Sequence, residues 1–136
     1  MVARLNANRK TAGCYVTTTP LGTGYSGTPT CTAGAGTSAT RAIANIDLAA
    51  WNDALLGASE TTGSSTKVGS ILGARGCVTF NSTTGLYRVA VAWQGMATTI
   101  SPASADSLAT CGQNLYGTSD ALRREVGVYV RIASLT

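Results

Sequence analysis

The side chains that could carry chemistry in this chain are four cysteines and six carboxylates, because the sequence contains no histidine. Without histidine the commonest general base is absent, and the Ser-His-Asp and Cys-His arrangements of hydrolases are excluded. Asp47 and Asp53 stand six residues apart on an expected helix, which places them about 120° apart around its axis. They are poorly placed as a catalytic pair, so we expect a protein that is not an enzyme and needs no cofactor or metal.

Two short motifs match catalytic or binding signatures but lack the surroundings that these signatures need. Residues 22–27 have the glycine pattern of dinucleotide-binding folds, which requires a strand before the glycines and a helix directly after them. Here residues 28–31 follow, with the sequence Thr-Pro-Thr-Cys. Residues 64–67 match Ser-x-x-Lys, but they stand in a polar segment without a companion motif. We interpret both segments as loops.

The cysteines predict disulfides. Cys14, Cys31, Cys77 and Cys111 form no Cys-x-x-Cys pair, and their spacing does not suggest a zinc site. Four cysteines allow three pairings, of which we favour Cys14–Cys31 and Cys77–Cys111. The first bond would close a short segment rich in Gly, Thr and Pro, and the second would pin a long loop to a sheet. The alternative is four reduced, buried thiols. Because disulfides persist in oxidising compartments, the first reading predicts an exported protein.

The bulk composition predicts one folded domain over residues 1–136. Hydrophobic residues make up 44% of the chain and charged residues 12%, whereas disordered chains show the opposite balance. The net charge of +4 is a weak signal for nucleic acid or anionic lipid. Residues 1–20 contain no apolar run that could serve as a signal peptide or membrane helix. We therefore expect a truncated chain, with Met1 as an added start codon.

Two helical segments are expected before the strands. Residues 1–12 are typical of the end of an N-terminal helix, with Arg9 and Lys10 near its negative C-terminal dipole and Gly13 as its stop. Residues 39–56 are expected to form a complete helix, capped by Ser38 and ended by Gly57. Its apolar residues recur at three- and four-residue steps, and the expected stripe consists of Ile43, Ile46, Ala50, Trp51, Ala54 and Leu55.

The hydrophobic period then changes to two, which predicts a sheet region over residues 76–135. Residues 77–80 and 86–94 should form a hairpin, residues 95–122 a long connection, and residues 124–135 a last strand. The apolar residues expected on one face of the sheet are Tyr87, Val89, Val91, Trp93, Val126, Val128, Val130 and Ile132. The two helices should cover this face. The predicted fold is α+β, with two helices packed on a mostly antiparallel three- to four-stranded sheet.

Basic residues gather at two places that are candidate interfaces. The first set is Arg4, Arg9 and Lys10, and the second is Arg123, Arg124 and Arg131. Proteins that bind single strands interleave such cations with stacking aromatic residues. Most aromatic residues of this chain are instead expected in the core, so protein partners are favoured over nucleic acid.

Several segments together resemble the globular domain of type IV pilus minor pilins of the PilV family, also called pilus modification proteins. Residues 4–9 are similar to the end of the family's long first helix. Residues 47–55 resemble its helix of the form Asp-x-x-x-Trp-x-x-x-Leu. The remaining similar segments are the strand at residues 87–95, which ends in Trp-Gln-Gly, and the closing strand at residues 124–135.

The resemblance implies a pilin-like fold with a truncated N-terminal helix, and a structural role. Such proteins are processed by prepilin peptidase, anchored in the inner membrane of Gram-negative bacteria through that helix, and face the periplasm before joining the extracellular pilus. Other minor pilins and a tip adhesin are the implied partners, in a complex that primes pilus assembly and sits at the tip. Two alternatives remain open, a type II secretion pseudopilin and a DNA-uptake pilin whose arginines 123, 124 and 131 read phosphates.

Overall fold

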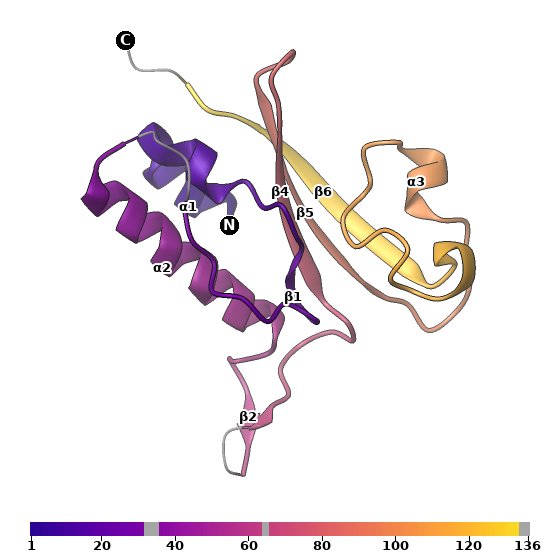
Figure 1. The fold of residues 1–136 in the computed structure, drawn as a ribbon. Coiled ribbons are helices and arrows are strands. Elements are labelled where there is room, and N and C mark those ends of the chain that lie inside the picture. Colours follow the sequence, from indigo (N-terminus) through magenta and orange to yellow (C-terminus); the bar gives the residue numbers. More distant parts are fainter. Residues whose placement is uncertain (32–35, 64–65, 134–136) are drawn as a thin grey trace.

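The computed structural model describes residues 1–31, 36–63 and 66–133, and it has three layers. An antiparallel sheet stands in the middle, two helices cover one of its faces, and the connection between the last two strands forms a lobe on the other face (Figure 1). We call residues 95–122 the lobe. Ser64 and Ser65 of the Ser-x-x-Lys motif and residues 134–135 of the expected last strand lie outside the described residues. Ile132 and Ala133 are described and are not part of a strand, so the last strand ends earlier than expected.

The N-terminal helix is shorter than the sequence predicts. α1 spans Val2–Ala7, and after Asn8 the chain continues as the 3₁₀ helix η1, Arg9–Tyr15. The backbone leaves the α conformation at Asn8, with φ −112° and ψ 40°. The Asn8 side chain explains the break, because its amide donates to the carbonyl oxygen of Thr40 at 2.8 Å and to the Tyr15 hydroxyl at 3.2 Å. Gly13 is not a stop, since η1 runs through it.

α2 spans Ser38–Leu55, close to the predicted bounds, but its cap is one residue earlier than expected. Thr37 is the N-cap. Its hydroxyl accepts from the Thr40 backbone N–H at 3.2 Å, and the Thr40 hydroxyl accepts from the Thr37 backbone N–H at 2.9 Å. This reciprocal capping box satisfies two N–H groups that a bare helix end leaves open. Beyond the last turn, Gly57 has φ +82°, which favours glycine.

The buried face of α2 differs from the expected stripe. Ala44, Leu48 and Leu55 are buried, whereas Ile43 and Ile46 are 49% and 67% exposed. The helix therefore turns the face that carries Ala44, Leu48 and Leu55 toward η1, β1 and β4. Its two isoleucines remain exposed to solvent. The expected stripe is confirmed at Leu55 and at Trp51, which packs against the core, and it is wrong at Ile43 and Ile46. This helix carries apolar residues on more than one face, so periodicity alone cannot choose between them.

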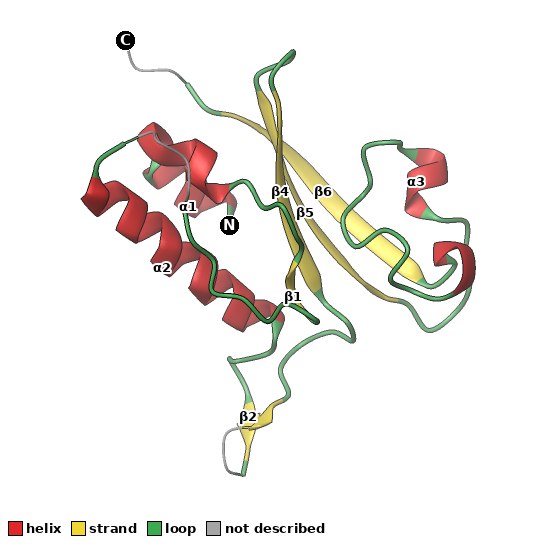
Figure 2. Cartoon of the chain, in the orientation of Figure 1, coloured by secondary structure: helices red, strands yellow, loops and turns green. Residues whose placement is uncertain are grey.

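The main sheet has the strand order β1-β4-β5-β6, and every neighbouring pair is antiparallel. Its strands are β1 Leu21–Gly22, β4 Arg75–Asn81, β5 Leu86–Gln94 and β6 Arg123–Arg131. The hairpin β4–β5 is confirmed, with β5 at the predicted bounds. The short edge strand β1 was not predicted. A separate small hairpin, β2 Thr61–Thr62 and β3 Thr66–Lys67, extends from one end of the molecule (Figure 2).

The sheet separates two cores, because successive residues of a strand point to opposite faces. Val78 and Val89 are opposite in the β4–β5 register and pack with the helices. Cys77 and Ala90 are the next pair, and they face the lobe. The helix-side core also contains Leu5, Tyr15, Leu21, Ala44 and Leu48, and the lobe-side core contains Ala92, Cys111 and Tyr116.

The helices cover only part of the expected apolar face. α2 packs over β1 and β4, so the far edge of the sheet at β6 lies beyond its reach. Val126 and Val128 of β6 are 58% and 48% exposed. The expectation of a fully covered face is therefore wrong at β6, because a cover only as wide as one helix pair does not reach every strand.

Both predicted disulfides are present. Cys14 bonds Cys31 beside the helix-side core, and Cys77 bonds Cys111 between β4 and the lobe. Each disulfide thus stabilises one of the two layers that flank the sheet. Among the described residues, no helix has the length and hydropathy needed to cross a bilayer.

Candidate functional site

The lobe is the largest part of the chain outside the helices and the sheet. It contains the short helix α3, Pro102–Ala105, and the 3₁₀ turn η2, Thr118–Asp120. Gly95 and Leu122 mark its two ends, and the Gly95 backbone N–H donates to the Leu122 carbonyl oxygen at 2.7 Å. The lobe is therefore a closed excursion from the sheet, fixed in the middle by the disulfide at Cys111.

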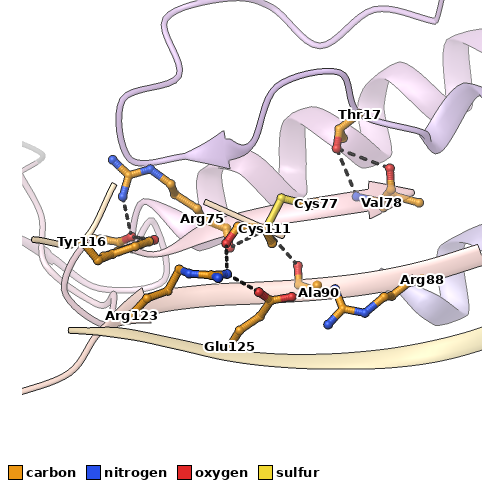
Figure 3. The surroundings of a disulfide bond; sticks show 11 residues. Thr17, Arg75, Cys77, Val78, Arg88, Ala90, Cys111, Tyr116, Arg123 and Glu125 are labelled. Atoms are coloured by element: carbon orange, nitrogen blue, oxygen red, sulfur yellow. Dashed lines mark hydrogen bonds and ion pairs between the residues drawn. A yellow bond between two sulfur atoms is a disulfide. The ribbon is translucent and has the colours of Figure 1, made fainter. Parts of the chain in front are cut away.

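A buried group of charges holds the lobe to the sheet beside this disulfide (Figure 3). Arg123 is 0% exposed. Its Nε donates to Asp120 Oδ2 at 2.8 Å, and its Nη1 donates to the carbonyl oxygen of Cys111 at 3.0 Å and to Glu125. Asp120 Oδ2 also accepts from the Asn114 backbone N–H at 2.8 Å. A buried guanidinium with two carboxylates in contact is the arrangement that a desolvated charge requires.

A second arginine enters the same group from the middle strand. Arg88 Nη1 donates to Glu125 Oε1 at 2.6 Å, so Glu125 is shared by two arginines. The Arg88 guanidinium lies directly over Gly127, where an added Cβ would come within 2.6 Å of Nη2. It also lies 5.9 Å from the centre of the Tyr129 ring. We call Arg88, Asp120, Arg123 and Glu125 the charge cluster. Its two positive and two negative formal charges cancel. Because Asp120 belongs to the lobe and the other three residues to the sheet, we interpret the cluster as a structural link between these two parts.

Tyr116 fixes the lobe at a second point. Its hydroxyl donates to the carbonyl oxygen of Gly73 at 2.6 Å, and the Arg75 guanidinium lies 4.9 Å from the centre of its ring. Burial raises the pKa of the Tyr116 hydroxyl, because the low-dielectric interior disfavours the phenolate. Tyr116 therefore stays a neutral hydrogen-bond donor at physiological pH.

An open groove of about 590 Å³ lies between the lobe and the tip of the β4–β5 hairpin. Its apolar lining consists of Phe80, Leu86, Leu108 and Tyr129, and Arg88 also lines it. The Nε of Arg88 is buried without a hydrogen-bond partner. The other lining groups are mostly hydroxyl and amide side chains, namely Thr79, Asn81, Ser82, Thr84, Ser107 and Thr110. These groups can hold a polar segment by hydrogen bonds, but they include no base or nucleophile pair.

The N-terminal basic set is divided between a paired and two unpaired residues. Arg4 Nη1 donates to Asp47 Oδ1 on α2 at 3.0 Å. The Tyr15 hydroxyl donates to the other oxygen of the same carboxylate. Arg9 and Lys10 are exposed on η1 and have no ion pair within the described residues. These two side chains are the available contact groups of the set.

Burial raises the pKa of Tyr15 to about 12, and its hydrogen bond to Asp47 acts in the same direction. Tyr15 is 0% exposed. The phenolate would have to form in the core beside a carboxylate, so the neutral form is favoured.

The C-terminal basic set is not one surface cluster. Arg123 is enclosed in the charge cluster and cannot contact a partner. Arg124 turns to the helix side of β6, where its Nη2 donates to the carbonyl oxygen of Ala97 at 2.6 Å. Arg131 is exposed at the other end of β6 and donates to the carbonyl oxygen of Thr84 at 3.1 Å. Alternation places Arg124 on the opposite face from the other two.

The charge cluster was missed by the sequence reasoning, although one signal for it was present. Arg123 and Glu125 stand two residues apart in a strongly alternating strand, so they share a face. Two residues of opposite charge on one face of a strand can indicate an ion pair that is buried on that face. Arg88 and Asp120 had no such signal, because their contacts depend on strand register and on the path of the lobe.

No group of three or more potential metal-ligating side chains gathers within the part of the chain that the structure describes. No protein-family profile, curated protein or solved structure matches the chain.

Proposed function

We propose that the protein is a structural minor pilin subunit of a type IV pilus, which works through protein–protein contacts. Its PilV-like segments, its α+β fold and its two disulfides support this role. In this proposal the native subunit is anchored in the inner membrane and joins the minor-pilin complex at the tip of the extracellular pilus. Its partners are other minor pilins and a tip adhesin.

The observation that carries the proposal is a set of exposed apolar side chains on the lobe. Met96 and Ile100 are 104% and 81% exposed, and Leu108 and Leu115 are each 52% exposed. In this proposal these four exposed side chains of the lobe are the groups that a neighbouring subunit covers. The charge cluster and the Cys77–Cys111 disulfide hold this segment on the sheet, so it can meet a neighbouring subunit without first having to order itself.

Pilus counts in the native host test the proposal. Deletion of the gene should reduce surface pili, and the wild-type gene should restore them. A Met96→Glu/Ile100→Glu variant should fold but fail to restore them, because each glutamate would have to be buried unpaired in the contact. Leu72→Glu is the matched control, since Leu72 is 68% exposed and lies outside the lobe. Normal piliation of the deletion strain would refute the proposal.

A second variant tests the N-terminal contact. Replacing Arg9 and Lys10 together by alanine should weaken pilus assembly, because both side chains are exposed on η1 and have no ion pair in the described structure. Lys67→Ala is the control, since Lys67 is an exposed cation on β3 that pairs with Asp53. Equal pilus counts for the double variant and the control would remove this surface from the proposal.

The two rival roles have different readouts. A type II pseudopilin would alter the secretion of exported enzymes and leave pili unchanged in the deletion strain. A DNA-uptake pilin would shift DNA in a gel with a steep salt dependence. The burial of Arg123 removes one of the three cations that such a pilin would use, which favours the structural role.

A further inference from the structure

A second open groove, of about 520 Å³, lies where the glycine motif at residues 22–27 approaches β4. Its volume is in the range of small-molecule sites, about 300–1,000 Å³. β1 precedes the glycines but no helix follows them directly, so the motif forms a loop. The polar side chains that line the groove are Thr19, Thr23, Tyr25, Ser26 and Arg75. Within the described residues, Arg75 is the only charged side chain in this lining.

The Arg75 guanidinium is held in place but not neutralised. It lies 4.9 Å from the centre of the Tyr116 ring, and its Nη1 donates to the carbonyl oxygen of Gly73 at 3.3 Å. The other end of the guanidinium points away from Tyr116 (Figure 3). In the described part of the chain, Arg75 forms no ion pair with a carboxylate. Its charge is therefore available to an anion in the groove.

The glycine motif leaves the Nη2 side of this guanidinium uncovered. Gly24 has φ +83°, and a Cβ at this position would lie 3.7 Å from Arg75 Nη2. The backbone N–H groups of Gly24, Ser26 and Gly27 form no hydrogen bond with any residue that the structure describes, and all three residues are exposed. Free N–H groups of a turn beside a cation are typical of anion-binding concavities. The loop and Arg75 thus offer donors to the same space.

We propose that this groove binds the phosphate group of a small phosphate ester or of a lipid headgroup. Phosphate carries nearly two negative charges and three strong acceptor oxygens at neutral pH. Arg75 supplies the opposite charge, in the guanidinium geometry that suits phosphate oxygens. The loop N–H groups and the hydroxyls of Thr23 and Ser26 supply further donors. No acidic side chain of the described residues lines the groove to repel the anion.

Titration of the purified protein with inorganic phosphate tests the site, followed by ¹H–¹⁵N spectra at constant ionic strength. The amides of Gly24, Ser26 and Gly27 should shift together and saturate, with a dissociation constant on the order of 1–10 mM. Acetate is the comparison anion, and it should shift them less because it has only two acceptor oxygens. Shifts that do not saturate, shifts confined to other residues, or equal shifts with acetate would overturn the proposal.

Two variants with matched controls locate the binding. Arg75→Gln should weaken phosphate binding at least about tenfold, whereas Lys10→Gln, which removes the same charge from an exposed residue outside the groove, should change it less than about twofold. Because Arg75 also contacts Tyr116, Ser26→Asp provides a second variant on an exposed loop, and its carboxylate should repel phosphate. Thr28→Asp is its control, since Thr28 is exposed in the same loop but does not line the groove. Equal affinities of these two aspartate variants would refute the site.

Two further ligands distinguish the sources of the phosphate group. Glycerol 3-phosphate presents it on a soluble ester, and phosphatidylcholine vesicles with phosphatidic acid present it at a membrane surface. Shifts with the ester but no sedimentation with the vesicles would assign the groove to soluble phosphate esters. Sedimentation that requires phosphatidic acid, and that Ser26→Asp abolishes but Thr28→Asp does not, would assign it to lipid headgroups. Binding of neither ligand would overturn the proposal.

Discussion

Arg88 does not bond the residue opposite it. Its register partner on β6 is Tyr129, yet its Nη1 donates to Glu125 Oε1 at 2.6 Å, four residues away from Tyr129 along the same strand. The guanidinium reaches this carboxylate by lying over Gly127, which has no side chain to block it. The charge cluster thus depends on one small residue as well as on its four charged ones.

Gly127→Ala should destabilise the fold. The new Cβ would come within 2.6 Å of Arg88 Nη2, and the arginine, only 8% exposed, has little room to withdraw. We expect a loss of about 1–3 kcal/mol of unfolding free energy, measured by urea denaturation with the disulfides intact. Gly13→Ala is the control for an added methyl group, since nothing lies within 4 Å of its Cβ position and its φ is not positive.

An unchanged midpoint for Gly127→Ala would show that Arg88 can leave Glu125 without loss. The double variant Gly127→Ala/Arg88→Met separates the two effects, because the shorter uncharged side chain relieves the clash. A cycle with both single variants should give a coupling free energy well away from zero.

Arg123→Met should be more damaging. It removes the partner of two carboxylates in the interior, and breaking a buried ion pair on one side costs about 3–5 kcal/mol. Arg131→Met on the same strand is the control, because Arg131 is exposed and should change stability by no more than about 1 kcal/mol. Similar unfolding midpoints for the two variants would contradict the structural role of the charge cluster.

The hairpin, the three long strands and both disulfides could be predicted because they follow from local patterns. Alternation sets Leu86–Gln94, and the polar turn before it fixes the pairing with β4. The exposure of Val128 could not be predicted, because alternation assigns a residue to a face but does not say how far a helix pair extends over that face. Ile46 on α2 shows the same limit for helical periodicity.

The candidate surfaces were harder to predict than the fold. Arg123 looked like a surface cation because Arg124 follows it directly and Arg131 stands on the same expected strand. Its burial depends on Asp120, which approaches through a turn with positive φ, and on Cys111, which the disulfide draws to β4. Such contacts between separate segments leave no periodic trace in the sequence.

Removing the lobe disulfide should loosen one layer and spare the other. For Cys77→Ala/Cys111→Ala we expect a loss of roughly 3–4 kcal/mol by the chain-entropy estimate. Hydrogen exchange should quicken first in residues 95–122, whereas the amides of α2 should keep their protection until global unfolding. Cys14→Ala/Cys31→Ala should give the opposite order. Uniform loss of protection in both variants would show that the two layers unfold as one unit.

Stability should fall as the pH rises from about 10 to about 12. The pKa of Tyr15 is raised to about 12, so between the unfolded value near 10 and this value only the unfolded chain releases the proton. The unfolded state then binds fewer protons, and stability decreases with pH. Tyr15→Phe should lose most of this slope. Urea denaturation at pH 9, 10 and 11 measures it, and equal slopes for the two proteins would assign the effect to other tyrosines.

The hydrogen bond between Gly95 and Leu122 has an evolutionary consequence. The two ends of the lobe meet at adjoining positions of the β5–β6 ladder, so the segment between them can lengthen, shorten or be exchanged without shifting the register of the sheet. The lobe is thus a segment that can vary while the sheet that carries it stays unchanged. Related chains with the same sheet could present different contact surfaces by varying this one segment.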